Sequence, residues 1–257
     1  DRMSFMRFLG INLCDKVPDA KTIWKFKNDL AETKTVNTLF CMFDEYLEKE
    51  GLISHKGTIV DATFVDAPRQ RNSRDENKKI KNGVIPEEWE KPENKSKLAQ
   101  KDTDADWTKK NGERHFGYKD HVKCDADSKL ITNYSVTSAS VHDSQRCLVF
   151  IGQEDEVLYA DSAYSGKPIA LALPENCKNQ ICEKGYRNSP LTSEQKMNNR
   201  RKSRIRCRIE HIFGFMTGAM HGITIRSIGI TRAWMNIGIT NLVYNFCRYS
   251  YLKRASA

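Results

Sequence analysis

The sequence predicts an α/β protein in which a mixed sheet is flanked by helices. Short apolar runs rich in β-branched residues alternate with amphipathic stretches, and turns or charged segments separate them. After a helical N-terminal segment, the order is strand, insertion, strand, strand, helix, strand, helix, strand, helix. Hydrophobic residues make up 39% of the 257 residues, which is enough for a substantial core.

Residues 1–56 form the expected helical N-terminal segment. One helix is predicted over Asp19–Leu30, directly after Pro18, and a second over Thr35–Glu50, whose apolar residues have helical spacing. The segment serves either DNA binding or dimerisation, and its pattern favours neither. The chain begins with Asp1 rather than Met, so we expect a fragment whose N-terminal segment is truncated.

Residues 57–257 are expected to form the α/β domain. Its first strand is predicted over Thr58–Val65, a run rich in β-branched residues. An insertion dominated by Lys, Arg, Glu, Asp and Asn follows at about 66–114, and we interpret it as a long solvated excursion. The remaining predicted elements are strands over 115–123 and 130–137 joined by a turn, a helix with Asp143 as N-cap, a strand over 157–160, a helix over 166–173, a strand over 180–183, and helices over 194–220 and 230–252.

Three acidic residues stand in unusual settings. Asp61 lies inside the first strand, Asp161 closes the strand over 157–160, and Glu210 lies within a basic stretch. A carboxylate costs several kcal/mol to remove from water unless something compensates it. A pair of divalent metal ions is the shared partner that we expect for the three.

The position of Glu210 on its helix supports this hypothesis. Five residues at helical spacing form one apolar stripe: Ile205, Ile209, Ile212, Phe213 and Met216. At about 100° per residue, Glu210 lies beside that stripe rather than opposite it. Arg206, one turn earlier, shares its flank and would hold Glu210 or bind a phosphate.

The chemistry that such a set of acids serves is phosphodiester cleavage or transfer. Two Mg²⁺ ions about 4 Å apart assist the attacking and the leaving oxygen, and Mn²⁺ is expected to substitute. Mg²⁺ prefers a few carboxylates together with water and substrate phosphates. Spacing alone leaves the alternative open that Asp161 is a turn residue and that Glu210 only pairs with Arg206 or Arg208.

The excess of basic residues favours a polyanionic partner, and nucleic acid comes first. Lys and Arg number 42 against 33 Asp and Glu, a formal net charge of +9. One short stretch is densely basic, with Arg200, Arg201, Lys202, Arg204, Arg206 and Arg208. We interpret it as a helix face that follows DNA phosphates, with a merely solvated face as the alternative.

Further contacts with DNA are predicted outside that stretch. Trp107, followed by Lys109 and Lys110, is a candidate for stacking on an unpaired base, although isolated tryptophans such as this one and Trp89 more often anchor a polar loop. His142 either touches the metal site or the scissile phosphate, or only begins a helix.

The cysteine pattern and the hydropathy favour a cytoplasmic protein. Eight cysteines are scattered, and they form neither a Cys-x-x-Cys pair nor a zinc site. Reduced thiols fit this pattern best. The first residues do not resemble a signal peptide, and no apolar stretch reaches about 18 residues, so no transmembrane helix is expected.

Several of these motifs resemble those of a known family. The stretches Asp61–Thr63, Tyr159–Tyr164 and Arg206–Gly214 are similar to signatures of DDE transposases from prokaryotic insertion sequences, above all the insertion-sequence-five group. Other stretches extend the resemblance over nearly the whole chain: 2–9, 67–72, 100–102, 107–110, 117–121 and 141–145.

The resemblance implies a ribonuclease H-like fold and a metal-dependent transposase. Such an enzyme cuts DNA at terminal inverted repeats and joins 3′-hydroxyl ends to target DNA. By motif position, Asp61, Asp161 and Glu210 would be the catalytic triad and the metal ligands. A homodimer on double-stranded DNA would bring two element ends together, in the cytoplasm and bound to the nucleoid.

Two departures from the family pattern matter. Related groups carry Tyr-x-x-Arg-x-x-x-Glu followed by a Lys, and here Arg206 and Glu210 fit, but Ser203 takes the Tyr place and Thr217 the Lys place. The contacts that Tyr and Lys make with the DNA end are therefore not carried over. Two alternatives stay open: a ribonuclease H-like nuclease without strand transfer, and a catalytically inactive DNA-binding remnant.

Overall fold

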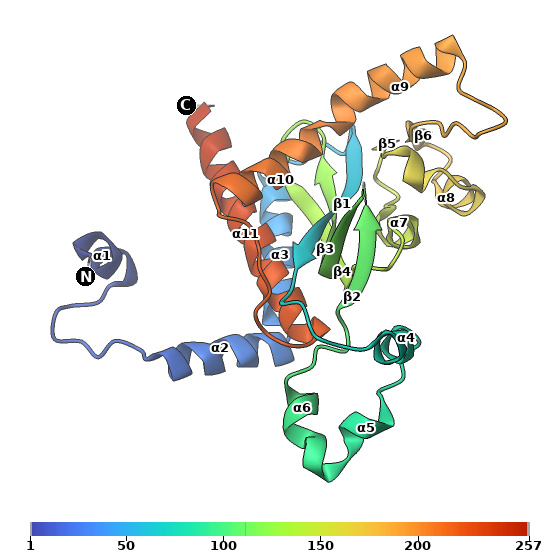
Figure 1. Ribbon diagram of the computed structural model, residues 1–257. Helices are drawn as coiled ribbons and strands as arrows, with labels where there is room; N and C mark the ends of the chain where they lie inside the picture. Colours follow the sequence, from blue (N-terminus) through green and yellow to red (C-terminus); the bar gives the residue numbers. More distant parts are fainter. Residues whose placement is uncertain (1, 111, 256–257) are drawn as a thin grey trace.

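A six-stranded mixed sheet lies at the centre of the protein (Figure 1). The computed structural model describes residues 2–110 and 112–255. The strand order is β2-β3-β1-β5-β6, with β4 also paired to β3. β3 runs antiparallel to β1, β2 and β4, whereas β5 runs parallel to both β1 and β6. The strands are β1 (Thr58–Asp66), β2 (Asp106–Lys110), β3 (Glu113–Asp125), β4 (Ile131–Ser138), β5 (Val157–Tyr159) and β6 (Lys178–Asn179).

Helices surround this sheet, which confirms the predicted α/β class with a mixed sheet. Short 3₁₀ helices occur at η1 (Pro92–Asn94) and η2 (Ser162–Tyr164). The α-helices are α1 (Met3–Leu9), α2 (Ala20–Glu32), α3 (Thr35–Lys49), α4 (Arg74–Lys81), α5 (Glu87–Glu90), α6 (Lys95–Ala99), α7 (Ser144–Phe150), α8 (Lys167–Ala172), α9 (Ser193–Arg206), α10 (Arg208–Gly218) and α11 (Ile230–Ala255).

The alternation of side chains along β1 divides the interior into two cores. Ile59 belongs to the larger core, to which α3, α10 and α11 contribute. Val60, on the opposite face, belongs to a second core with residues of α7 and α8. The side chain of each β1 residue therefore faces one of two different helical layers, and this decides which helices can reach Asp61.

The N-terminal segment packs against the C-terminal helix. The predicted helices correspond to α2 and α3, and Asp19 caps α2 by accepting a hydrogen bond of 2.7 Å from the Thr22 amide. α2 and α3 both contact α11. Met3–Leu9, by contrast, forms a helix with no buried residue, which lies apart from the sheet in Figure 1.

The insertion at 66–114 extends from the sheet and is mostly exposed, as its composition predicted, but it contains a buried anchor and its end joins the sheet (Figure 1). Trp89 is completely buried, and its indole N–H donates a hydrogen bond of 2.8 Å to Glu76. Its last part forms β2, which pairs with the first half of β3 and so belongs to the sheet. Trp89 thus acts as the local anchor that was the alternative to base stacking.

The helix predicted over 194–220 is interrupted, which corrects the prediction of one continuous helix. α9 ends at Arg206, Cys207 lies between, and α10 begins at Arg208. α9 buries no residue, whereas α10 buries Ile209, Ile212 and Met216 against the sheet. The break therefore separates a helix that extends away from the sheet (Figure 1) from one that the core holds.

Two smaller findings complete the fold. The strand predicted over 180–183 is wrong in its bounds, since β6 covers Lys178–Asn179. The chain nevertheless continues along β5, because the amides of Gln180 and Cys182 donate to the carbonyls of Leu158 and Ala160. Within the described ranges, no helix combines the length and the apolar character that crossing a membrane requires.

Candidate active site

Asp61 and Asp161 lie level with each other on neighbouring parallel strands. Ile59 pairs with Tyr159, and each aspartate follows two residues later. Ile59 and Tyr159 both belong to the larger core or pack against it. Because side chains alternate along a strand, the two carboxylates point to that same face, toward the layer that contains α10.

The junction of α9 and α10 brings Arg206 and Glu210 to the same place. α9 contacts β5, and α10 contacts β1. Arg206 donates one hydrogen bond of 2.8 Å to Asp61 and another of 3.2 Å to Glu210. The apolar stripe that predicted the position of Glu210 is confirmed, since Ile209 and Ile212 are fully buried beside it.

The electrostatics of Asp61 are those of a crowded acid. Burial raises its pKa to about 6, and the charge of Asp161 acts in the same direction. The Ala62 amide, at 2.8 Å, and the Arg206 guanidinium oppose this rise. Burial also disfavours the charge of Arg206, but the carboxylates beside it outweigh that effect and raise its pKa. Arg206 is thus the main positive charge that balances these acids.

Asp161 combines a structural and a charged role. It occupies the N-cap position of η2 and accepts a hydrogen bond of 2.8 Å from the Ala163 amide. The alternative that Asp161 is a turn residue is therefore correct, but it accounts for only one of its two carboxylate oxygens. Its second carboxylate oxygen makes no hydrogen bond within the described ranges, so this acid still has an oxygen to offer.

The donor set fits a divalent metal. Three carboxylates converge, two of them half-buried and facing the same layer, and hard cations prefer such oxygen ligands. Arg206 already holds a cationic position between Asp61 and Glu210. The ligand atoms of the three acids are not all within 4.8 Å of one another. Within the described residues, only a second group of side chains meets that limit.

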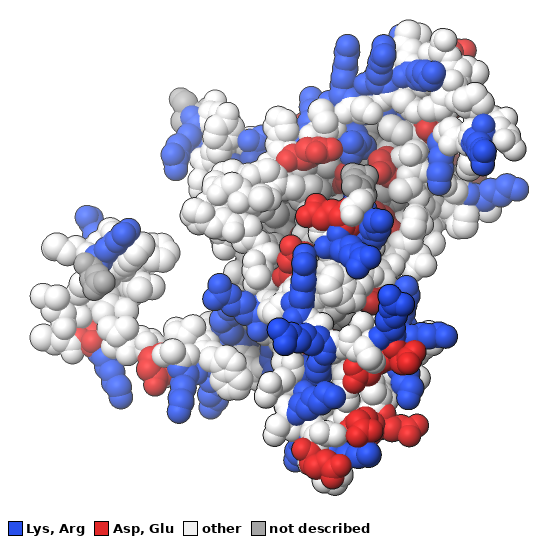
Figure 2. Space-filling view, in the orientation of Figure 1, with Lys and Arg blue, Asp and Glu red and all other residues white. Residues whose placement is uncertain are grey.

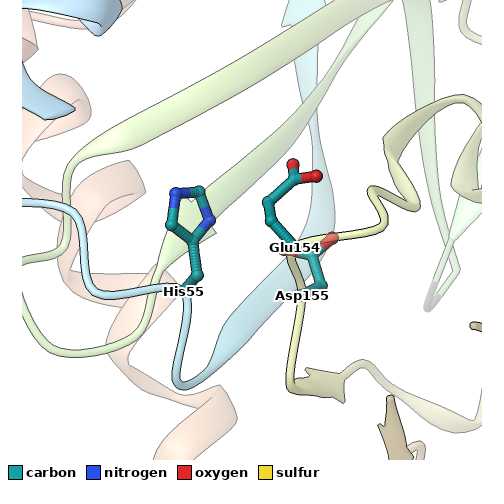
Figure 3. A group of neighbouring side chains, drawn as sticks. All are labelled: His55, Glu154 and Asp155. Atoms are coloured by element: carbon teal, nitrogen blue, oxygen red, sulfur yellow. The ribbon is translucent and has the colours of Figure 1, made fainter. Parts of the chain in front are cut away.

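That other group is His55, Glu154 and Asp155 (Figure 3). Asp155 is buried, accepts a hydrogen bond of 2.6 Å from Thr58 and pairs with the Lys123 ammonium at 2.8 Å. Because the lysine already neutralises this cluster, we interpret it as a structural ion pair rather than a metal centre. No local pattern in the sequence predicted this cluster, since its members lie about 100 residues apart, before β1 and before β5.

Apart from Arg206, the predicted DNA-binding residues of α9 and of the start of α10 divide into two sets. Lys202 donates to the Ile181 carbonyl at 2.8 Å, and Arg208 to Ala126 and Asp127, so these cations have partners within the protein. Three others are exposed and have no partner within residues 2–110 and 112–255: Arg200, Arg201 and Arg204. Figure 2 shows Lys and Arg gathered along α9, at the top of the view.

Trp107, Lys109 and Lys110 lie on β2. Trp107 is half-buried against Phe116, with ring centroids 5.1 Å apart, and its ring is also covered by the Arg69 guanidinium. Lys109 and Lys110 are exposed. The structure thus shows Trp107 as a sheet residue.

His142 agrees with one of its two predicted alternatives, whereas Asp143 differs from its predicted role. His142 is exposed and its Nδ1 pairs with the Ser144 hydroxyl at 2.8 Å, as expected for a residue that only begins a helix. Asp143 occupies the N-cap position of α7, but its side chain makes no capping bond. It pairs instead with the buried ammonium of Lys119 at 2.8 Å.

Tyr164 is a neighbour of the site that the residue pattern did not single out. Its side chain is almost completely buried, and its hydroxyl has no hydrogen-bond partner in the described part of the chain. Burial raises its pKa, and the charges of Asp61 and Asp161 add to the effect. Its position three residues after Asp161 is the signal that points to it.

Comparison with known proteins supports this interpretation of the site. Residues 53–246 match the family described as a transposase DDE domain, and residues 1–29 match a family described as a transposase domain (DUF772). The first match covers most of the chain and includes all three acids. No solved structure matches the chain.

Proposed function

The chain belongs to the transposases with a DDE domain, enzymes that catalyse DNA cleavage and transfer, and we propose that Asp61, Asp161 and Glu210 are its catalytic acids. The observation that carries the proposal is the level position of Asp61 and Asp161 on adjacent strands, with Glu210 joined to Asp61 through Arg206. The ribonuclease H-like fold and the insertion-sequence-five group belong to the same proposal.

The proposed reaction is cleavage at terminal inverted repeats followed by strand transfer. A water oxygen attacks the scissile phosphorus, and the bond to the 3′ oxygen breaks, so a 3′-hydroxyl end is released. That hydroxyl then attacks a phosphorus of the target DNA and displaces another 3′ oxygen. A pair of Mg²⁺ or Mn²⁺ ions, bound by the three acids, would supply charge stabilisation to the attacking and leaving oxygens.

The protein's own residues position the reactants. Arg206 keeps Asp61 and Glu210 together and offsets part of their negative charge. The exposed residues of α9 extend this positive surface, and we propose that Arg200, Arg201 and Arg204 contact DNA phosphates. Trp107, Lys109 and Lys110 belong to the same proposal, with His142 as its auxiliary residue.

The assembly that we propose is a homodimer on double-stranded DNA, which would hold two element ends. Residues 1–56 would serve as the DNA-binding or dimerisation module, and 57–257 as the catalytic domain. Within residues 2–56, the exposed apolar side chains of the α1 helix are consistent with a partner, and the structure includes none.

A joining assay tests the proposal. Oligonucleotides that carry the element's ends are incubated with Mg²⁺ and a plasmid target. We expect joined products with the wild type and a loss of about a thousandfold or more for Asp161→Asn, because metal charge stabilisation contributes several kcal/mol. Asp29→Asn, an exposed acid on α2, is the matched control and should behave as wild type.

Each other outcome contradicts part of the proposal. Nicking without joining identifies a nuclease without strand transfer. Binding without metal-dependent cleavage identifies an inactive remnant. Equal activity of Asp161→Asn and Asp29→Asn would remove Asp161 from the catalytic set.

A further inference from the structure

A cationic pocket lies where the insertion joins the sheet. It has a volume of about 420 Å³ and is lined by residues from three segments: 67–70, 97–102 and 226–228. Four of its residues are basic, namely Arg69, Lys97, Lys101 and Arg226, and one is acidic, Asp102. It shares none of its residues with the acids described above, and the segments that form it lie far apart in the sequence.

The one acid of the pocket does not neutralise its cations. Asp102 is buried and accepts hydrogen bonds of 2.8 and 2.7 Å from the Tyr118 hydroxyl. It also accepts from the amides of Asp104 and Ala105, each at 3.1 Å. Its lone pairs are therefore directed to groups other than the basic side chains, and the pocket keeps a surplus of positive charge.

Internal contacts hold the cations in place. Lys101 donates to the Asn72 side chain at 2.6 Å and to the Arg71 carbonyl at 3.0 Å, and its ammonium lies over the Trp89 ring. Arg69 is stacked over Trp107 at 5.8 Å. Lys97 pairs with Glu76 at 3.6 Å, whereas these contacts hold Lys101 and Arg69 in place without neutralising them, which reduces the ordering cost of binding an anion.

Arg226 completes the pocket from the other end of the chain. It is exposed and makes no ion pair or side-chain hydrogen bond within the described ranges. Its backbone is fixed, because the preceding residue, Ile225, is fully buried and donates its amide to the Asp66 carbonyl at 3.0 Å. A free guanidinium on a fixed backbone is well suited to a planar, two-point contact with a phosphate.

We propose that this pocket binds a phosphate of the DNA backbone. The proposal deepens the function above and rests on it, because DNA as substrate supplies the anion. Ala67, in the pocket lining, follows Asp61 by six residues, and these span about 20 Å in an extended chain. Since phosphates of one strand are about 3.4 Å apart along the duplex, the pocket would contact DNA about six base pairs from the acids.

The distribution of charge on this face agrees with such a contact. Figure 2 shows acidic side chains near the middle of the view, with Lys and Arg above them, and with Lys and Arg among further acidic side chains below them. Figure 1 places α9 at the top and the helices of the insertion at the bottom of the same view. A duplex that crosses the acids would thus meet positive charge on both sides.

Salt-dependent binding tests the proposal in the full chain. The double variant Arg69→Ala/Arg226→Ala is compared with Lys49→Ala/Lys178→Ala, which removes two exposed cations outside the pocket. Binding to a duplex of about 30 base pairs is measured without divalent metal over a range of salt concentrations. Loss of two phosphate contacts should reduce the slope of log K against log salt by about 2 in the pocket variant and leave the control at the wild-type slope.

The outcomes separate this proposal from others. Equal slopes for the two double variants would overturn it. Titration with inorganic phosphate is the second arm. If the pocket variant loses phosphate binding while the salt slope of its DNA binding stays at the wild-type value, the pocket binds free phosphate and the proposal is overturned. Urea unfolding of both variants verifies that they fold. The salt titration contains no metal and does not depend on catalysis. A wild type that fails to cleave in the joining assay with Mg²⁺, while the pocket variant still shows the reduced slope, would contradict the proposed function and leave the pocket supported.

Discussion

Two groups of acids lie along β1, and they are compensated in opposite ways. The group at the beginning of the strand, with Asp155 as its buried member, is paired to Lys123, whose side chain is only 8% exposed. The group farther along is joined by Arg206, which is 20% exposed and pairs with Asp61, itself 15% exposed. The central ion pair of the first group is therefore closed to solvent, whereas the central pair of the second remains partly open to it.

The difference teaches how to recognise acids that are available for a metal. Closeness alone would select His55, Glu154 and Asp155, because their ligand atoms lie within 4.8 Å of one another. Yet both oxygens of Asp155 already accept hydrogen bonds, from Thr58 and Lys123. A set of acids is available when its compensating pair is partly open to solvent and some carboxylate oxygens are free, and this describes the second group.

The largest expected effect comes from breaking the closed group. Asp155→Ala leaves the Lys123 ammonium buried without its main partner, so we expect a loss of about 3–5 kcal/mol in the free energy of unfolding. Glu154→Gln is the control: Glu154 is half-exposed and 3.7 Å from the same ammonium, and its loss should cost less than about 1 kcal/mol. Urea unfolding measures both, and equal losses would contradict the structural role of Asp155.

A pH effect is expected at the open group. Because the pKa of Asp61 is raised from 3.8 to about 6, protonation of this acid favours the folded state. The contribution is fully present below pH 3.8 and is lost as the pH rises through about 6. Without metal, the wild type should therefore lose stability relative to Asp61→Asn over this window, by an amount on the order of 3 kcal/mol.

Unfolding curves at several pH values check this, with Asp29→Asn as the control that should keep the wild-type profile. Parallel profiles for the wild type and Asp61→Asn would show that Asp61 is an ordinary solvated acid. Saturating Mg²⁺ should remove the difference between them if the metal compensates the charge of Asp61.

The smallest effect is expected on α9. Arg204→Ala removes one exposed cation and should lower the salt slope of DNA binding by about 0.9, with a severalfold loss of affinity. Arg208→Ala is informative beside it, because Arg208 pairs with Asp127 and should change the slope less. A larger change of slope for Arg208→Ala than for Arg204→Ala would mean that Arg208 leaves Asp127 to contact DNA.

Local patterns predicted much of the fold. β1, β3 and β4 were predicted nearly to their ends, because β-branched runs and a clear turn mark them. The interruption at Cys207 was not predicted, since the sequence on both sides favours a helix and only burial of α10 against the sheet distinguishes the two parts. β2 was missed because its polar residues become a strand only by pairing with β3.

The candidate site was predicted unevenly for the same reason. The positions of Asp61 and Asp161 follow from strand patterns, and the place of Glu210 beside the buried stripe follows from helical periodicity. The partners of Lys202 and Arg208 could not be predicted from such patterns, because Ile181 and Ala126 come close to them only in the folded chain. Long-range pairing likewise explains why the closed group around Asp155 had no signal in the sequence.

The most direct test of the account asks where a metal binds. Fe²⁺ replaces Mg²⁺ in the wild-type protein, and ascorbate with peroxide generates hydroxyl radicals that cut the backbone beside the bound ion. Mass spectrometry then locates the cuts. We predict cuts beside Asp61, Asp161 and Glu210 that excess Mg²⁺ suppresses. Suppressible cuts beside His55 and Glu154 instead would contradict the assignment of the metal to the open group.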